Sequence, residues 1–173
     1  MNTIIEKLTE SGLKKRLSEL KIIVDTREQQ THLMEYFDKH KIPYDNRALE
    51  TGDYSAMVGD MTLERDVVCE RKHGLDELCQ NYSNDRARFE REFIRAKAYG
   101  TKIFLIVENA TWTDVFLGNY RSKLSSKSLT GSILSWLARF DVTLIFCKPD
   151  ETPRLIYGIL YYFAREELLY GHG

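Results

Sequence analysis

The sequence predicts a single α/β domain, with a mixed central β-sheet that helices flank on both faces. The chain has 173 residues, of which 43% are hydrophobic and 12% aromatic, enough for one real core and too apolar for a disordered chain. Apolar strand-like runs alternate with helical patterns in the second half, which favours parallel neighbouring strands. A hairpin turn signal, Gly59-Asp60, lies in the first half and makes the predicted sheet mixed.

The elements of the first half follow from short apolar runs and the residues that end them. Residues 1–20 are predicted to form an N-terminal helical arm, and residues 21–170 the single core domain. The β-branched run at residues 21–24 predicts a buried strand, and a helix is expected from Thr31 to His40, before Pro43. Three further strands are predicted, over residues 44–49, 53–58 and 61–71.

In the second half, Gly74 ends the preceding strand and helices become more frequent. We predict a short helix over residues 75–82 and a separate long helix over residues 85–99, which Gly100 ends. The remaining prediction is a strand at 103–107, a helical turn at 112–117, a mobile polar segment at 118–126, a helix at 128–140, a strand at 142–147 and a last helix ending near 170.

The composition indicates whether the protein is expected to contain disulfides, to enter a membrane or to be secreted. The three cysteines are widely spaced and form no CxxC pair, so neither a zinc site nor a disulfide framework is indicated. The longest uncharged apolar stretch, residues 155–164, is too short to span a bilayer, and the N-terminus carries Glu6 and Glu10 and lacks the long apolar core of a signal peptide. We therefore expect a cytoplasmic, reduced protein with no membrane partner.

The formal net charge of −1 argues mildly against nucleic-acid binding, but positive charge is clustered locally. Local patches matter more to phosphate binding than the total charge. The two clusters are Arg86, Arg88, Arg91, Arg95 and Lys97, and Arg121, Lys123 and Lys127. Arg91 and Arg95 fit ion pairs along a helix, whereas Arg86 and Arg88 are candidates for phosphate contact.

Three stretches carry the chemistry: residues 24–28 (VDTRE), 52–54 (GDY) and 69–72 (CERK). They supply four carboxylates and a lysine, namely Asp25, Glu28, Asp53, Glu70 and Lys72. Carboxylate oxygens hold Mg²⁺ or Mn²⁺, the cation polarises a phosphate and activates water, and a nearby lysine offsets the developing charge. The set is typical of a metal-dependent phosphodiesterase.

The three charged residues of the last stretch, Glu70, Arg71 and Lys72, are expected to point to different faces of their strand. Side chains two apart share a face, so Glu70 and Lys72 point one way and Arg71 the other. Taken alone, each motif has a simpler interpretation as surface charge or as a turn residue. Three consecutive charges directly after the apolar run Val67-Val68-Cys69 are costly, however, unless they reach a cleft or are paired.

Other charged and aromatic residues are interpreted structurally. Glu64 also precedes an arginine, but it lies near the hairpin tip and is taken as a solvated strand residue, as are Asp60 and Asp66. His73 is left out of the site. The tyrosines of the last helix are interpreted as core or interface residues.

In their residues and their order along the chain, these motifs resemble the XPF/Mus/Hef-type nuclease domain, also called the ERCC-type domain. That domain belongs to the restriction-endonuclease-like PD-(D/E)XK superfamily. The family signature is GD…ERK, followed by an Asp-Leu-like helix and an Arg-Phe-x-x-Gln. Asp76-Glu77-Leu78 resembles the first, and residues 88–92 (RFERE) resemble the second, with Glu92 in place of Gln. The resemblance covers about residues 21–168, and the chain is similar to the compact stand-alone versions of bacteria and their phages.

The resemblance implies a restriction-endonuclease-like fold and a site made of named residues. Asp25, Glu28, Asp53 and Glu70 would be ligands or near-ligands of Mg²⁺ or Mn²⁺, and Lys72 would position the attacking water. Arg71 would support the site or touch DNA, and Arg27, Arg86 and Arg88 are the expected DNA contacts. Members cut branched DNA such as flaps, forks and junctions, usually as dimers, so the expected partners are DNA and either a second copy or a protein that supplies DNA-binding modules.

Two other functions stay open at this point. The same scaffold could carry a junction resolvase or a sequence-specific nuclease. The family also includes non-catalytic halves of heterodimers, which bind branched DNA but tend to lose the carboxylates or the lysine that this sequence retains.

Overall fold

The structure is a computed structural model, and it describes residues 8–29 and 31–171, without the side chains of residues 84 and 85. Within them the elements are α1 (Glu10–Leu17), β1 (Leu20–Val24), α2 (Thr31–Lys39), β2 (Tyr44–Asn46), β3 (Tyr54–Val58), β4 (Met61–Thr62), β5 (Val67–Lys72), α3 (Leu75–Tyr99), β6 (Lys102–Glu108), α4 (Trp112–Leu117), α5 (Ser126–Arg139), β7 (Val142–Cys147) and α6 (Thr152–Tyr170).

The strands form one mixed sheet, as the sequence predicts. Its order is β2-β1-β3-β5-β6-β7, with the short β4 paired to β3 outside this path. β3 runs antiparallel to both of its main neighbours, β1 and β5, whereas β5, β6 and β7 are parallel to one another. The carboxyl ends of these three parallel strands therefore meet at one edge of the sheet, where α/β proteins gather their functional groups.

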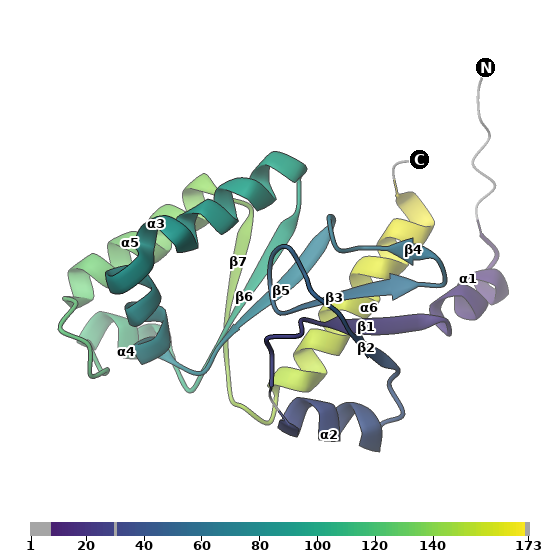
Figure 1. Cartoon of the computed structure of the whole chain (residues 1–173), viewed down its shortest axis with the longest axis horizontal. Coiled ribbons are helices and arrows are strands. Elements are labelled where there is room, and N and C mark those ends of the chain that lie inside the picture. The colour runs from purple at the N-terminus through teal and green to yellow at the C-terminus, as the bar shows by residue number, and fades with distance from the viewer. Residues whose placement is uncertain (1–7, 30, 172–173) are drawn as a thin grey trace.

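Helices cover both faces of the sheet, and Figure 1 shows the two groups on opposite sides of the strands: α3, α4 and α5 together, and α1, α2 and α6 together. Alternation along β5 separates the two cores, because Val67 and Cys69 pack in the cluster with α6, whereas Val68 packs in the cluster with α3 and α5. The α/β class and the helices on both faces are thus confirmed.

Several predicted boundaries are wrong. α3 is one continuous helix over Leu75–Tyr99 rather than two, since the buried residues of its two halves, from Leu78 to Ala96, pack on the same core and override the weak helix formers near residue 84. The predicted strand at 61–71 is interrupted by a turn at residues 64–66, so it forms β4 and β5 and places Glu64 in that turn. β2 ends at Asn46, three residues before the predicted end.

The described part of the predicted N-terminal arm is docked on the domain. α1 buries Leu13 and Leu17 in the same hydrophobic cluster as Leu160 and Ala164 of α6, and residues 1–7 lie outside the described residues. A separate finding is that none of the helices in the described ranges is long and apolar enough to cross a membrane.

Candidate active site

The end of β5 brings the charged triplet into the interior. All six residues of β5 are buried, and Glu70, Arg71 and Lys72 are between 4% and 9% exposed. The strand pairs in parallel with β6 through Lys72 and Val107, so its charged end is fixed on that side by a regular ladder. Charges buried to this degree must be paired, and the pairing divides them between the two faces of the sheet.

The loop before β3 sets Asp53 against this triplet. Gly52 has φ = 77°, and a Cβ there would lie 2.7 Å from the Cβ of Val68, so only glycine lets the loop approach β5 this closely. The backbone N–H of Asp53 donates to the carbonyl of Cys69 at 2.9 Å, and its carboxylate Oδ2 accepts the N–H of Arg71 at 2.8 Å. Asp53 is thereby held beside Glu70.

On the α3 face, Asp53, Glu70 and Lys72 line one cleft of about 290 Å³. Lys72 Nζ donates to Glu70 Oε1 at 2.7 Å and lies 3.7 Å from Glu77 of α3. The ring of Phe89, also from α3, has its centroid 5.5 Å from the same ammonium. The lysine is therefore held between β5 and α3, paired with Glu70 on the strand and Glu77 on the helix.

The charges in this cleft act strongly on one another. Burial, and then repulsion by Glu70, raise the pKa of Asp53 well above its ordinary value of 3.8. Burial alone would lower the pKa of Lys72, but the attraction and hydrogen bond of Glu70, together with the charges of Asp53 and Glu77, raise that pKa. Burial and the charge of Glu70 also raise the pKa of Glu92. The cleft is thus a buried carboxylate pair that favours a cation.

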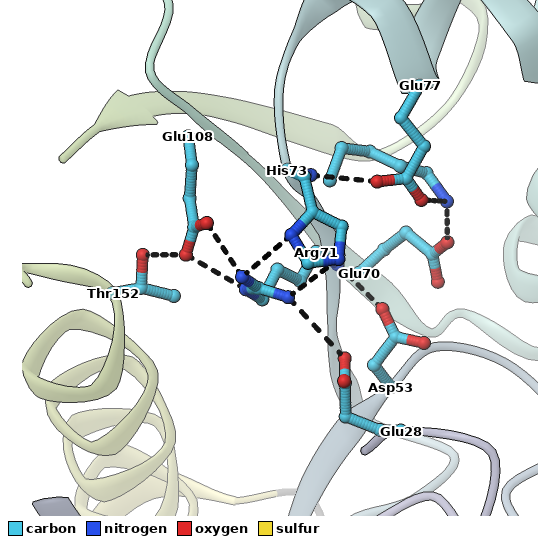
Figure 2. Close-up of polar contacts among 9 residues, drawn as sticks. Glu28, Asp53, Glu70, Arg71, His73, Glu77, Glu108 and Thr152 are labelled. Carbon is cyan, nitrogen blue, oxygen red and sulfur yellow. Dashed lines mark hydrogen bonds and ion pairs between the residues drawn. The ribbon is translucent and has the colours of Figure 1, made fainter. Parts of the chain in front are cut away.

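On the opposite face, Arg71 forms a buried clamp with β6 and α6. Its guanidinium donates to both oxygens of Glu108, at 2.8 and 2.7 Å, and Thr152 Oγ1 donates to the same carboxylate at 2.6 Å. Glu28 Oε2 lies 4.0 Å from Arg71 Nη1. Figure 2 shows this clamp and, beside it, Asp53 and Glu70, so Arg71 acts as a support of the strand end.

Asp25 and Arg27 belong to the wall of the site. Asp25 is fully buried, and both of its oxygens are engaged: Oδ1 accepts from the N–H and Nε of Arg27, and Oδ2 accepts from the N–H of Leu49 at 2.7 Å. This bonding fixes the loop that leads to Asp53, rather than presenting Asp25 to a ligand. The Arg27 side chain is 64% exposed, and it lines the cleft together with Asp53.

The two arginines expected to contact phosphates lie in different places. Arg88 lines the cleft beside Asp53 and Glu70. Arg86 instead bonds to Glu90 at 3.1 Å and to the hydroxyl of Tyr82 at 2.9 Å, on the side of α3 that faces Trp136. The structure therefore brings Arg88 to the site and places Arg86 outside it.

The carboxylates present suit a Mg²⁺ or Mn²⁺ site that is completed by other oxygens. Among the described residues, no group of three or more His, Cys, Asp or Glu side chains is arranged as a ready-made metal site. Mg²⁺ commonly uses one or two carboxylates together with waters and substrate phosphates. Asp53 and Glu70, as adjoining buried carboxylates in an open cleft, fit that pattern.

Three acidic residues around the site were missed as site residues. Glu108 ends β6 without any motif, and only the register of β6 beside β5 shows that it faces Arg71. Glu77 and Glu92 both lie in segments that resemble family motifs, and the helical spacing of residues 77, 81, 88 and 92 could have placed them on the face of α3 towards β5.

The comparisons with known proteins agree with this architecture. The ERCC4 domain family matches residues 24–159, most of the chain, and the chain belongs to this family, whose nuclease domain has the restriction-endonuclease-like fold. A search of curated proteins finds no match.

Two solved structures of XPF from Aeropyrum pernix, one of them in complex with DNA, share the fold. The first has a TM-score of 0.63 and 18% identity, over 85% of this chain and 66% of that chain. The complex with DNA has a TM-score of 0.63 and 17% identity, over 84% of this chain and 65% of that chain. The chain therefore spans just under two thirds of the length of these XPF chains.

Proposed function

We propose that this protein is a DNA endonuclease that depends on Mg²⁺ or Mn²⁺ and selects branched DNA such as flaps, forks and junctions. Its membership of the ERCC4 domain family supports the general class, a DNA endonuclease. The observation that carries the metal-dependent mechanism is that Asp53, Glu70 and Lys72 line one cleft, although they come from two separate stretches of the chain.

Each residue of the cleft has a distinct role in this proposal. Asp53 and Glu70 hold the cation, while Glu28 and Asp25 support the loop and strand around them. The bound cation would polarise the scissile phosphate and lower the pKa of a water molecule. Lys72 then orients the attacking water and offsets negative charge on the phosphate, because its ammonium is already fixed within 2.7 Å of Glu70. Arg71 keeps the strand end rigid from the other face.

Arg27 and Arg88 are the proposed phosphate contacts at the cleft. Both side chains line the same hollow as Asp53, and two guanidinium groups there would attract the DNA backbone despite the near-neutral total charge. The XPF structure in complex with DNA supports DNA as the ligand of this fold. We further propose that the protein acts as a homodimer or with a partner that supplies DNA-binding modules.

A substrate panel tests this function. The purified protein is incubated with end-labelled flap, fork, four-way junction and plain duplex DNA, in Mg²⁺, in Mn²⁺ and in EDTA. We expect cutting near the branch of at least one branched DNA, slower cutting of duplex, and none in EDTA. Cutting of the junction alone would favour a resolvase. Tight binding to branched DNA without cutting in either metal would instead identify a non-catalytic binding subunit.

A matched pair of variants tests the site. Glu70→Gln should lower cutting at least about a hundredfold, because metal-assisted catalysis supplies several kcal/mol of transition-state stabilisation. The control is Glu64→Gln, which also precedes an arginine but pairs with Arg47 at the surface, and it should cut at the wild-type rate. Near-normal turnover of Glu70→Gln would show that the site is assigned wrongly.

A further inference from the structure

We propose that the connection between α4 and α5 together with the first two residues of α5, residues 118–127 (the basic loop), binds the sugar–phosphate backbone of the DNA strand that leaves the active-site cleft. This inference rests on the proposed function and names a second contact surface for the same substrate. The connection lies at the left edge of the molecule in Figure 1, on the α3 side of the sheet.

Charge is distributed very unevenly around the basic loop. Acidic residues make up 26 of the 173 residues, yet none occurs from residue 115 to residue 140. The loop itself carries three cations, Arg121, Lys123 and Lys127, and all three are exposed. A purely solvated surface of this protein would mix both signs, so a span with only positive charge suits an anionic partner.

A path of adjoining hollows joins the basic loop to the catalytic residues. One hollow is lined by Asp53 and Lys72, and it shares His73 and Glu77 with the next. That second hollow includes Arg121, which also lines a third hollow at the loop together with Ser122. Neighbouring hollows with shared lining residues therefore lead from Lys72 to the loop, a route that suits a DNA strand whose phosphate lies at Lys72 better than an acidic protein.

Two hydrogen bonds to Asp76 fix the position of Arg121. Its backbone N–H donates to Asp76 Oδ1 at 2.7 Å, and its Nε donates to Asp76 Oδ2 at 2.9 Å. The side chain is nonetheless 93% exposed, so the outer nitrogens of the guanidinium face solvent. Asp76 belongs to the first turn of α3, four residues after Lys72, and it ties the loop to the helix that follows the catalytic strand. A guanidinium held in this way is suited to bind a phosphate oxygen pair.

Neutralising the basic loop tests the proposal. A triple variant, Arg121→Ala, Lys123→Ala and Lys127→Ala, is compared with a control that loses three cations from the other face of the sheet, Lys14→Ala, Lys15→Ala and Lys39→Ala. A second variant, Lys123→Ala with Lys127→Ala, leaves the Arg121–Asp76 anchor intact in case the triple variant fails to fold. Binding of a fluorescein-labelled forked duplex is measured in EDTA between 50 and 200 mM salt, and the cleavage kinetics are measured with Mn²⁺.

The two readouts have stated outcomes. Since each phosphate contact contributes about 0.9 to the slope of log affinity against log salt, the slope should fall by about 2–3 for the triple variant and about 2 for the double variant. KM should rise while kcat stays at the wild-type value, and the control should match wild type. A wild-type slope and KM in both loop variants, or an equal loss in the control, would overturn the inference. If the wild-type protein cuts no DNA, the proposed function itself fails.

Discussion

Asp53, a proposed metal ligand, is held in a setting that disfavours its charged form. Its carboxyl is buried beside Glu70, and both effects raise its pKa, so folding disfavours the charged carboxylate when no cation is bound. The N–H of Arg71 and the glycine before Asp53 keep it there regardless. A bound cation would remove the repulsion, and for this reason we expect metal binding and stability to be linked at this residue.

This linkage predicts how stability depends on pH. A carboxyl whose pKa is raised by folding binds more protons in the native state than in the unfolded state, so its contribution to the unfolding free energy is lost as pH rises above 3.8, the ordinary value. Asp53→Asn has no such loss. The difference in unfolding free energy between Asp53→Asn and wild type should therefore grow in favour of the variant from pH 4 to pH 8 in EDTA.

Urea denaturation at several pH values measures this difference, with Asp66→Asn, an exposed residue, as the control. Saturating Mg²⁺ at neutral pH should stabilise wild type but not Asp53→Asn. A difference that stays constant with pH would mean that the carboxyl of Asp53 is not strained in the native state.

The sequence identifies the residues of the cleft better than it identifies their supports. Glu70 and Lys72 stand out because charges that follow a buried run need a cleft, and the structure gathers both with Asp53. Asp25 lies in an equally suggestive motif, but its oxygens turn to Leu49 and Arg27, a choice that depends on a loop with no pattern of its own. Glu108 could not be predicted, because it acts only through the register of two strands distant in sequence.

At the scale of elements, β5 carries residues of the candidate active site on one face and the buried clamp of Arg71 on the other. Its even-numbered residues Glu70 and Lys72 face α3, and Arg71 faces α6, where Glu108 and Thr152 bind it. Burial alone would raise the pKa of Glu108, but the hydrogen bonds from Arg71 and Thr152, together with the positive charge of Arg71, lower it. The clamp therefore keeps its charges at neutral pH and fixes the ends of β5, β6 and α6 relative to one another.

Removing one partner of this clamp should be costly. Glu108→Ala leaves a buried guanidinium without its carboxylate, which typically lowers the unfolding free energy by about 3–5 kcal/mol. Lys102→Ala, at the other end of β6, removes a surface pair with Asp141 and a contact with the ring of Phe104, and it should cost about 1 kcal/mol or less. Chemical denaturation of both variants measures the contrast. Equal costs would show that the clamp contributes no more than a surface pair.

The sequence predicts the positions of most strands but not every helix and strand boundary. Apolar runs located most strands within two residues, because a buried strand must be apolar. The two helices predicted for residues 75–99 form the single helix α3. Contacts of Leu78 and Phe93 with the same hydrophobic cluster outweigh the low helix propensity of the residues between them. The strand predicted for residues 61–71 is divided into β4 and β5, because the chain turns at residues 64–66 before β5 pairs with β3.

For the whole molecule, the sheet separates two hydrophobic clusters that share its strands. One cluster contains Leu160 of α6 and the other contains Ile133 and Trp136 of α5, and all three residues are almost fully buried. Because β5, β6 and β7 contribute side chains to both clusters, loss of either cluster should destabilise the strands that the two clusters share. We therefore propose that residues 21–170 fold as one cooperative unit.

Cavity variants on the two faces test this proposal. Leu160→Ala and Ile133→Ala should each lower the unfolding free energy by about 2–5 kcal/mol. Both tryptophans, Trp112 and Trp136, pack in the second cluster, so in Leu160→Ala the fluorescence transition should move together with the transition seen by far-ultraviolet circular dichroism. A fluorescence midpoint that stays at the wild-type value in Leu160→Ala would indicate two independently folding parts.

The opposite orientations along β5 have a practical consequence. The groups proposed to perform the cutting point away from the clamp of Arg71, Glu108 and Thr152, so a substitution among them leaves the contacts of that clamp in place. A Glu70→Gln protein retains the pairing of Arg71 with Glu108 and could serve as a reagent that captures intact branched DNA from a mixture.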